Sequence, residues 1–220
     1  TTDGALWSWG NGSFGKLGHG DTQWQLPPKK VEALAGQRVV AVSAGDSHSL
    51  ALTADGAVWS WGWGGSGQLG HGDEQQNQLL PKKVEALAGR RVVAVSAGYF
   101  HSFAITADGA VWSWGQGDVG QLGHGDLQNQ LLPKEIESFA GQRVVAVSAG
   151  GLHSLAITAN GALWSWGYGY RGRLGHGDEQ EQLLPKQVEA FAGQHVVAVS
   201  AGGFHSFALT SSGAVWSWGH

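Results

Sequence analysis

The sequence predicts an all-β protein of the propeller type, built from four repeats that each form a four-stranded antiparallel blade. Three observations carry this prediction. Glycine supplies 37 of the 220 residues and tryptophan 12, whereas cysteine and methionine are absent. The segment GALWSWG at residues 4–10 returns, with Val for Leu in some copies, at spacings of 52 or 53 residues. Each copy contains short alternating apolar segments bounded by glycine turns, which is typical of a propeller blade.

The repeats define a single domain over residues 1–220. They begin near Gly4, Gly56, Gly109 and Gly161, with a partial copy at Gly213. The segments VVAVSAG and LGHGD each recur four times without change. Four repeats plus a fifth copy of one strand leave three arrangements open: part of a longer array, a four-bladed ring, or two chains that share a larger ring. The start at Thr1 and the absence of methionine favour the first.

The repeat that begins at Val92 shows why four strands are expected. Residues 92–98 are β-branched and small, which is typical of a buried strand. Residues 101–106 alternate with a period of two, and the following TADG predicts a hairpin turn because glycine adopts the positive φ that the turn requires. Residues 111–114 place two Trp side chains on one face. The segment 133–139 fits a one-turn helix or a strand. We prefer a short outer strand, which completes the sheet.

Charge and composition exclude several classes of function. Thirteen Lys and Arg against 17 Asp and Glu give a net charge of −4, and no basic run exceeds two residues, so no nucleic-acid partner is expected. No apolar run approaches the roughly 20 residues of a membrane helix, so no membrane partner is expected either. The absence of cysteine excludes disulfides and thiolate metal sites. No unique nucleophile stands beside a unique base, so we expect no catalytic residue, no metal and no cofactor.

The combined pattern identifies a family resemblance. WSWGxGxxGxLGHGD, then LPxxVE, then VVAVSAGxxHSxALT resembles the repeat of the regulator of chromosome condensation (RCC1) family over essentially the whole chain. The resemblance implies a β-propeller, with rings usually of seven blades, and a cytoplasmic or nuclear location. It does not fix a function, because the family includes an exchange factor for the Ran GTPase, the plant UV-B photoreceptor and interaction domains of HECT-type ubiquitin ligases. The last two are the closest in style.

Several motifs that suggest chemistry have simpler structural interpretations. The GxGxxG at residues 10–15 matches a dinucleotide fingerprint, but no helical pattern follows, so we interpret its glycines as turn residues. Histidines and aspartates recur at equivalent positions in each repeat, which predicts repeated structural hydrogen bonds and turns rather than a single active site. The histidines at the first position are His19, His71, His124 and His176, and those at the second are His48, His101, His153 and His205. The aspartates are Asp21, Asp73, Asp126 and Asp178. Ten of the twelve tryptophans lie in the Trp-Ser-Trp-Gly strands and are interpreted as core between blades.

The positions that differ between repeats predict a binding face. In an antiparallel blade, the loops after the first and third strands lie on the same face, and most of the variation falls in these loops. Several of the varying residues are aromatic or Arg, the types enriched at interface hot spots. The alternative is neutral drift in exposed loops. The candidate protein-binding residues are Phe14, Trp63, Tyr99, Phe100, Leu152, Tyr168, Tyr170, Arg171 and Phe204.

The sequence thus favours a non-enzymatic scaffold that binds a protein partner or another copy of itself through this face. The alternative is a signalling member of the family, either UV-B photoreceptor-like or a nucleotide exchange factor for a Ran-type GTPase. The photoreceptor carries a Gly-Trp-Arg-His-Thr motif. The matching positions here begin at Gly45, Gly98, Gly150 and Gly202 and carry no Trp-Arg pair, which argues against UV-B sensing. No sequence matching the protruding wedge of the exchange factor is present either.

Overall fold

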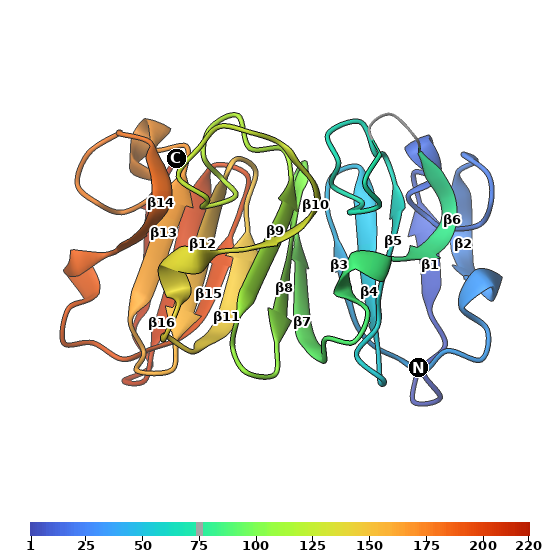
Figure 1. Ribbon diagram of the computed structural model, residues 1–220, viewed down its shortest axis with the longest axis horizontal. Helices are drawn as coiled ribbons and strands as arrows, with labels where there is room; N and C mark the ends of the chain where they lie inside the picture. The colour runs from blue at the N-terminus through green and yellow to red at the C-terminus, as the bar shows by residue number, and fades with distance from the viewer. Residues whose placement is uncertain (74–76) are drawn as a thin grey trace.

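Five antiparallel sheets follow one another along the chain in the computed structural model, which describes residues 1–73 and 77–220 (Figure 1). The first sheet holds β1 (Trp7–Gly10) and β2 (Gln25–Lys30), and the second holds β3 (Val39–Ala44), β4 (His48–Thr53), β5 (Val58–Gly62) and β6 (Gln78–Lys83). The third holds β7 (Val92–Ala97), β8 (His101–Thr106), β9 (Val111–Gly115) and β10 (Gln130–Glu135), and the fourth holds β11 (Val144–Ala149), β12 (His153–Thr158), β13 (Leu163–Gly167) and β14 (Gln182–Gln187). The fifth holds β15 (Val196–Ala201), β16 (His205–Thr210) and β17 (Val215–Gly219). Three sheets are therefore the expected four-stranded blades, and the two end sheets contain two and three strands.

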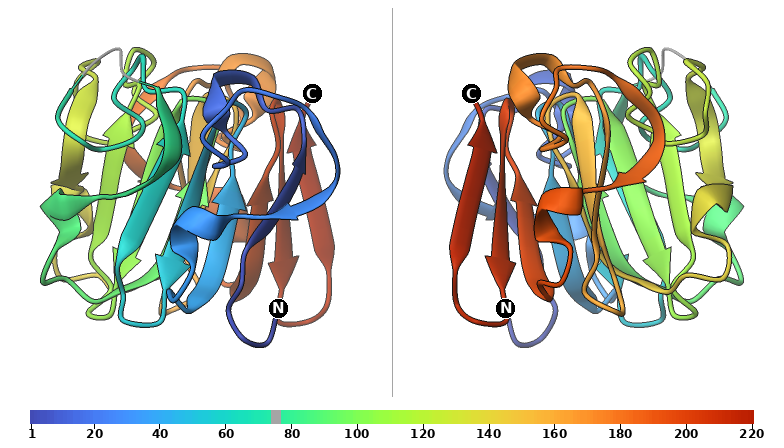
Figure 2. Two further views of the ribbon diagram at one scale, coloured as in Figure 1. Left: turned by 90° about the vertical axis from the view of Figure 1, so that its right-hand side faces the viewer. Right: turned by 90° about the vertical axis from the view of Figure 1, so that its left-hand side faces the viewer.

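The strands of every blade run between the same two faces of the molecule (Figure 2). In the third sheet, the register pairs Ala104 of β8 with Val95 of β7 on one side and with Trp112 of β9 on the other. The first strands of consecutive blades contact one another, β3 with β7, β7 with β11 and β11 with β15. These contacts place the first strand of each blade on the inside of the arrangement.

The outer segment of each repeat contains both of the structures that the sequence left open. The predicted outer strand over 133–139 is wrong in its extent, because β10 ends at Glu135 and a one-turn 3₁₀ helix, η4 (Glu137–Phe139), follows it. The next residue, Ile136, donates its backbone N–H to the Val111 carbonyl at 2.8 Å, and the strand does not continue beyond this bond. The turn then directs Phe139 toward the next blade, where its ring lies 5.7 Å from that of Trp164. The same turn follows β2, β6 and β14, as η2 (Glu32–Leu34), η3 (Glu85–Leu87) and η6 (Glu189–Phe191).

The hydrophobic core lies between blades, as the repeated Trp pattern predicted. One cluster joins Phe103 and Ile136 of the third sheet to Ala156 and Trp166 of the fourth, all with almost no exposed surface. The end sheets depart from this pattern because only one side of each is covered. Trp9 is 59% exposed, whereas the equivalent Trp114 is completely buried. The prediction that the tryptophans form the core therefore holds for the inner blades and is wrong for the ends.

A relay of hydrogen bonds crosses each blade boundary and explains one set of repeated histidines. Ser102 donates to the Gln68 carbonyl at 2.8 Å, so its oxygen is left to accept from His48 Nε2, also at 2.8 Å. Trp114 Nε1 donates to the same Gln68 carbonyl at 2.8 Å. Equivalent contacts start from His101 and His153. The prediction of structural histidines is confirmed for these residues.

The second set of repeated polar residues stays within its own blade. His19, His71, His124 and His176 each contact the Ser of the neighbouring Trp-Ser-Trp strand at 2.9 or 3.0 Å. Asp21, Asp126 and Asp178 each accept a backbone N–H from the residue two positions later. These observations confirm the structural interpretation for these residues. The corresponding partner position of Asp73 lies outside the described residues.

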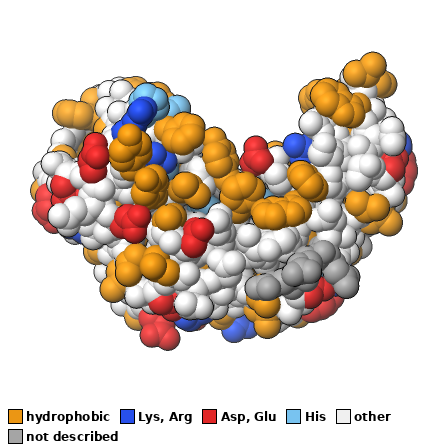
Figure 3. All heavy atoms as spheres, turned by 90° about the horizontal axis from the view of Figure 1, so that it is seen from above, with side chains coloured by type: hydrophobic (Ala, Val, Ile, Leu, Met, Phe, Trp, Pro, Cys, Tyr) orange, Lys and Arg blue, Asp and Glu red, His pale blue; other side chains and the backbone are white. Residues whose placement is uncertain are grey.

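The blades form an open arc rather than a closed ring (Figure 3). Figure 3 shows a crescent with a hollow side, and β1 pairs with β2 while β17 pairs with β16, so no pairing in the described residues joins the two ends. Each end therefore presents a blade surface that is buried elsewhere in the molecule. Phe207 is 41% exposed at the C-terminal end, whereas the equivalent Phe103 is buried.

Candidate functional site: the loop face

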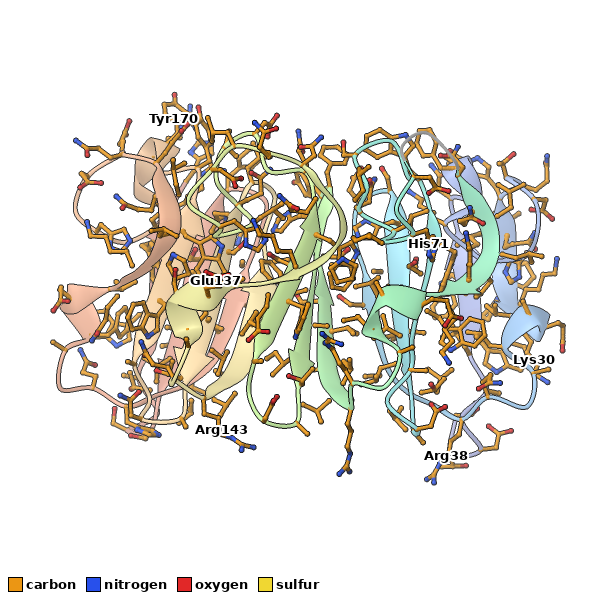
Figure 4. The ribbon with its side chains drawn as sticks, viewed as in Figure 1. Lys30, Arg38, His71, Glu137, Arg143 and Tyr170 are labelled. Atoms are coloured by element: carbon orange, nitrogen blue, oxygen red, sulfur yellow. The ribbon has the colours of Figure 1, made fainter. Side chains whose placement is uncertain are left out.

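The loops after the first and third strands of each blade lie on one face, which we call the loop face. Figure 4 shows Tyr170 at this face, and Arg38 and Arg143 at the opposite one. The loop face is the one seen in Figure 3, where apolar side chains follow the crescent and basic and histidine side chains lie beside them at one end. The loops come together here because alternate turns of an antiparallel sheet lie at the same edge.

Four of the predicted residues form an aromatic ridge on this face: Phe14, Trp63, Phe100 and Tyr99. The ring centroids of Phe14 and Trp63 are 6.3 Å apart, those of Trp63 and Phe100 5.2 Å, and those of Phe100 and Tyr99 6.2 Å. Trp63 meets Phe100 edge to face at 73°, a geometry that is favourable beyond the burial of area. Phe14 is 44% exposed, and the other three are half-buried.

Tyr99 extends from the aromatic ridge toward the C-terminal blades because two glycines leave room for it. A Cβ atom on Gly203 would overlap the Tyr99 hydroxyl oxygen, and one on Gly151 would lie 3.1 Å from Tyr99 Cε2. These glycines occupy the loop position that carries Asp46 and Tyr99 itself in the two preceding blades. The absence of side chains at Gly151 and Gly203 therefore connects the ridge to the next group of residues.

Four further predicted residues, together with Arg173, form an arginine cluster. They are Tyr168, Tyr170, Arg171 and Phe204. Arg173 is only 1% exposed, and its Cζ lies 5.1 Å from the Tyr168 ring centroid and 5.3 Å from that of Phe204. Its Nε donates to the Tyr170 carbonyl at 2.9 Å, and one terminal nitrogen donates to the Gly203 carbonyl at 3.3 Å. Arg171 is exposed, with its Cζ 5.3 Å from the Tyr170 centroid.

No carboxylate of the described residues compensates the positive charge of this cluster. Burial lowers the pKa of the Arg173 guanidinium, and the nearby Arg171 lowers it further, while the hydroxyls of Tyr168, Tyr170 and Tyr99 act in the opposite direction. In the described part of the chain, the salt bridges are Lys30–Glu32 and Lys134–Asp126, so neither arginine of the cluster has a carboxylate partner there. The exposed Arg171 therefore presents hydrogen-bond donors at the surface, and the buried Arg173 adds positive charge beside it.

One residue position decides the conformation of each glycine-rich loop. Gln68 and Gln121 accept the backbone N–H of the residue two positions earlier, Ser66 and Val119, each at 3.0 Å. Lys16 and Arg173 occupy the same position in the other two loops and have no such acceptor. Those two loops contain η1 (Ser13–Gly15) and η5 (Tyr170–Gly172).

The two loops that lack the glutamine also share an unusual backbone conformation. Phe14 and Arg171, each two positions before the substituted residue, have φ values of 63° and 62°. They are the two non-glycine residues with positive φ in the described ranges 1–73 and 77–220. This left-handed conformation is costly for a residue with a side chain.

The predicted residues thus fall into two connected groups on one face. Leu152 is half-buried in the loop between them, and its carbonyl accepts the Tyr168 N–H at 2.9 Å. The comparison of repeats places Arg173 among the variable loop positions, with Arg where two other repeats have Gln, but the candidate binding residues did not include it. Sequence reasoning also missed His220, whose ring contacts the Arg171 guanidinium. Within the described residues, no three His, Asp or Glu side chains are placed to hold a metal ion. No helix in those residues is long and apolar enough to cross a membrane.

Repeated blades in an arc, with invariant boundary contacts and a variable loop face, define a repeat protein of the propeller type. A family model of the RCC1-like domain matches residues 1–220, and the chain belongs to this family. It is 40% identical to the ultraviolet-B receptor UVR8 of Arabidopsis thaliana over 97% of this chain and 48% of UVR8. It is 42% identical to the human E3 ubiquitin-protein ligase HERC2 over 100% of this chain and 5% of HERC2. The chain therefore spans about half or less of the length of these relatives.

Solved structures show the same architecture. Prp20p from Saccharomyces cerevisiae, a protein described with its binding to Gsp1p and histones, superimposes with a TM-score of 0.80 at 26% identity. The match covers 90% of this chain and 50% of Prp20p. This similarity confirms the predicted all-β propeller class.

Proposed function

We propose that this chain is a non-enzymatic scaffold that binds a protein partner, or another copy of itself, through the loop face. The observation that carries the proposal is the side-chain contact between residues that vary from repeat to repeat. Phe14, Trp63 and Phe100 come from loops of three consecutive blades and still meet as one aromatic ridge. Residues that drift independently on a surface are not expected to assemble in this way.

The composition of the loop face supports binding to a protein. Trp, Tyr and Arg are the residue types enriched at interface hot spots, where a few residues carry most of the binding energy. Phe14, Tyr170 and Phe204 are 44%, 44% and 49% exposed, so they retain apolar surface for a partner to cover. Full burial of an aromatic side chain is worth roughly 1.5–3 kcal/mol relative to exposure.

The relatives are consistent with this proposal. Prp20p is described by its binding to two kinds of protein, Gsp1p and histones. HERC2 is a ligase, but this chain matches 5% of its length. In the chain itself, His48, His101 and His153 are used in bonds between blades, which leaves them unsuited to acid–base work at the surface.

The test is a paired substitution in the aromatic ridge. Tyr99→Ser together with Phe100→Ser removes two anchors, and we expect weaker self-association by light scattering and the loss of chemically crosslinked protein partners. Leu132→Ser together with Leu184→Ser is the matched control, because both residues are about half exposed on outer strands. If both double variants behave like the unmodified chain, the proposal is wrong.

A second candidate, a UV-B-responsive role, is favoured by the 40% identity to UVR8 and by Trp63 on the loop face. Irradiation at the tryptophan absorption edge while the oligomeric mass is measured tests it, with Trp63→Phe as the comparison. An unchanged mass removes this candidate.

The third possibility, nucleotide exchange, is tested by the rate of nucleotide release from a Ran-type GTPase with and without the chain.

A further inference from the structure

The arginine cluster contains a buried charge that the described residues of the chain do not neutralise. Arg173 is 1% exposed, and in the described residues neither it nor Arg171 lies within salt-bridge distance of a carboxylate. Buried charged groups are normally paired, because removal of a charge from water is costly. Two bonds to backbone carbonyls and two aromatic rings stabilise Arg173 in part, but none of these groups carries a negative charge.

The other repeats show that this charge is not required by the fold. Gln68 and Gln121 occupy the equivalent position, are buried and neutral, and support the backbone of their own loops. The Arg173 side chain has no oxygen to accept the backbone N–H of the residue two positions earlier. That residue, Arg171, adopts a φ of 62°. Strained backbone and an unpaired buried charge in the same loop are features that persist where function requires them.

The groups around Arg173 define the chemistry that would complete the cluster. The chain has three tyrosines, and all three, Tyr99, Tyr168 and Tyr170, lie close enough to Arg173 to affect its pKa. Tyrosine hydroxyls and guanidinium groups all donate hydrogen bonds. A carboxylate accepts such bonds through two oxygens and forms bidentate pairs with arginine. It is therefore the complementary group in size, charge and geometry.

We propose that the arginine cluster binds the carboxylate of an Asp or Glu side chain in an extended segment of a protein partner, with the aromatic ridge taking an apolar side chain of the same segment. This inference rests on the proposed function of the loop face and adds the chemistry of the partner. Tyr99 connects the two subsites, because its ring starts in the ridge and its hydroxyl reaches Gly203, whose carbonyl accepts from Arg173.

A protein carboxylate fits this surface better than a nucleic acid. Binding to a nucleic-acid backbone uses many Lys and Arg side chains that follow the phosphates. The chain has a net charge of −4, and the other Lys or Arg described in the loop-face loops, Lys16, donates to the Asp46 carbonyl at 3.0 Å. Two arginines beside aromatic rings are sufficient for one or two carboxylates.

The experiment selects binders of the intact chain from a random-peptide library and compares the peptides selected by its variants. We expect enrichment of Asp or Glu next to an aromatic or aliphatic residue. Arg173→Gln should abolish the acidic enrichment and weaken binding of a selected peptide by about thirtyfold or more. Arg143→Gln, an exposed arginine on the opposite face, is the matched control and should change neither.

The variants separate failure of this inference from failure of the proposed function. If Tyr99→Ser with Phe100→Ser removes peptide binding while Arg173→Gln leaves the selected sequences unchanged, the loop face binds proteins and the carboxylate assignment is wrong. If neither variant changes the selected peptides, both proposals are wrong. A single-stranded oligonucleotide is the comparison ligand. Tighter binding of the oligonucleotide, lost in Arg173→Gln, would also overturn the peptide assignment.

Discussion

Three buried histidines make stability depend on pH. Burial lowers the pKa of His48 to about 4 and those of His101 and His153 to about 3. Because these values lie below the ordinary value of 6.5, the folded state binds the proton less well than the unfolded state. Their contribution is fully present above pH 6.5 and is lost as the pH falls toward 4. Each should lose roughly 2 kcal/mol between about pH 7.5 and about pH 5.

Urea denaturation at these two pH values tests the prediction. The midpoint should fall clearly at the lower pH, and His101→Asn should show a smaller fall than the unmodified chain. Equal midpoints at both pH values would contradict the assignment of neutral histidines to the blade boundaries.

Phe103 and Phe207 occupy the same position in two repeats and differ in burial, at 0% and 41% exposed. Phe103→Ala should cost about 3–5 kcal/mol, because it leaves a cavity between two covered blades. Phe207→Ala should cost much less, because its blade surface faces solvent. Chemical denaturation of the two variants measures the difference, and equal losses would indicate that the C-terminal blade is covered in solution.

The glycine-rich loops are the elements in which one side chain sets the backbone. Arg173→Gln should supply the acceptor that Gln68 and Gln121 provide in their loops, relieve the positive φ of Arg171 and remove a buried charge. We expect a gain of about 1–2 kcal/mol in the free energy of unfolding. The reverse change, Gln121→Arg, should destabilise by a similar amount. Thermal unfolding followed by circular dichroism compares them, and destabilisation by Arg173→Gln would contradict this account.

Element by element, much of this structure could be predicted. The alternation of residues 101–106 gave a strand with the same bounds as β8, and the antiparallel order placed Trp63 and Phe100 on one face. The end of the outer strand could not be predicted, because it depends on the bond between Ile136 and Val111 in the folded sheet. Nor could the burial of Arg173, since its sequence position is variable and its orientation follows from packing against Tyr168 and Phe204.

At the scale of the whole molecule, the two ends of the arc leave bonds of the blade relay unfilled in the described residues. In the described residues, His205 contacts no serine, whereas His48, His101 and His153 each contact one. At the other end, Trp9 lacks the carbonyl that accepts from Trp61, Trp114, Trp166 and Trp218 in the described residues. Each end therefore exposes apolar blade surface that the inner blades bury, with Trp9 59% and Phe207 41% exposed.

We accordingly expect the 220-residue chain to self-associate through these exposed end surfaces as its concentration rises. Phe207→Glu should lower the mass measured by light scattering at high concentration, while the same change at the exposed Leu184 should not. A mass that is independent of concentration would show that the end surfaces stay uncovered.

The same relay recurs at the three blade boundaries that start from His48, His101 and His153. His, Ser, a main-chain carbonyl and Trp meet in the same way at each inner boundary, whatever side chains the loops above them carry. A change in the order of the blades would therefore preserve the relay but not the packing beside it, which uses Leu50 and Leu87 at one boundary and Phe103 and Phe139 at the next. Exchange of the second and third blades would separate Trp63 from Phe100 and create different neighbours on the loop face. A new recognition surface could then arise by recombination of repeats, without a single new residue in the interior.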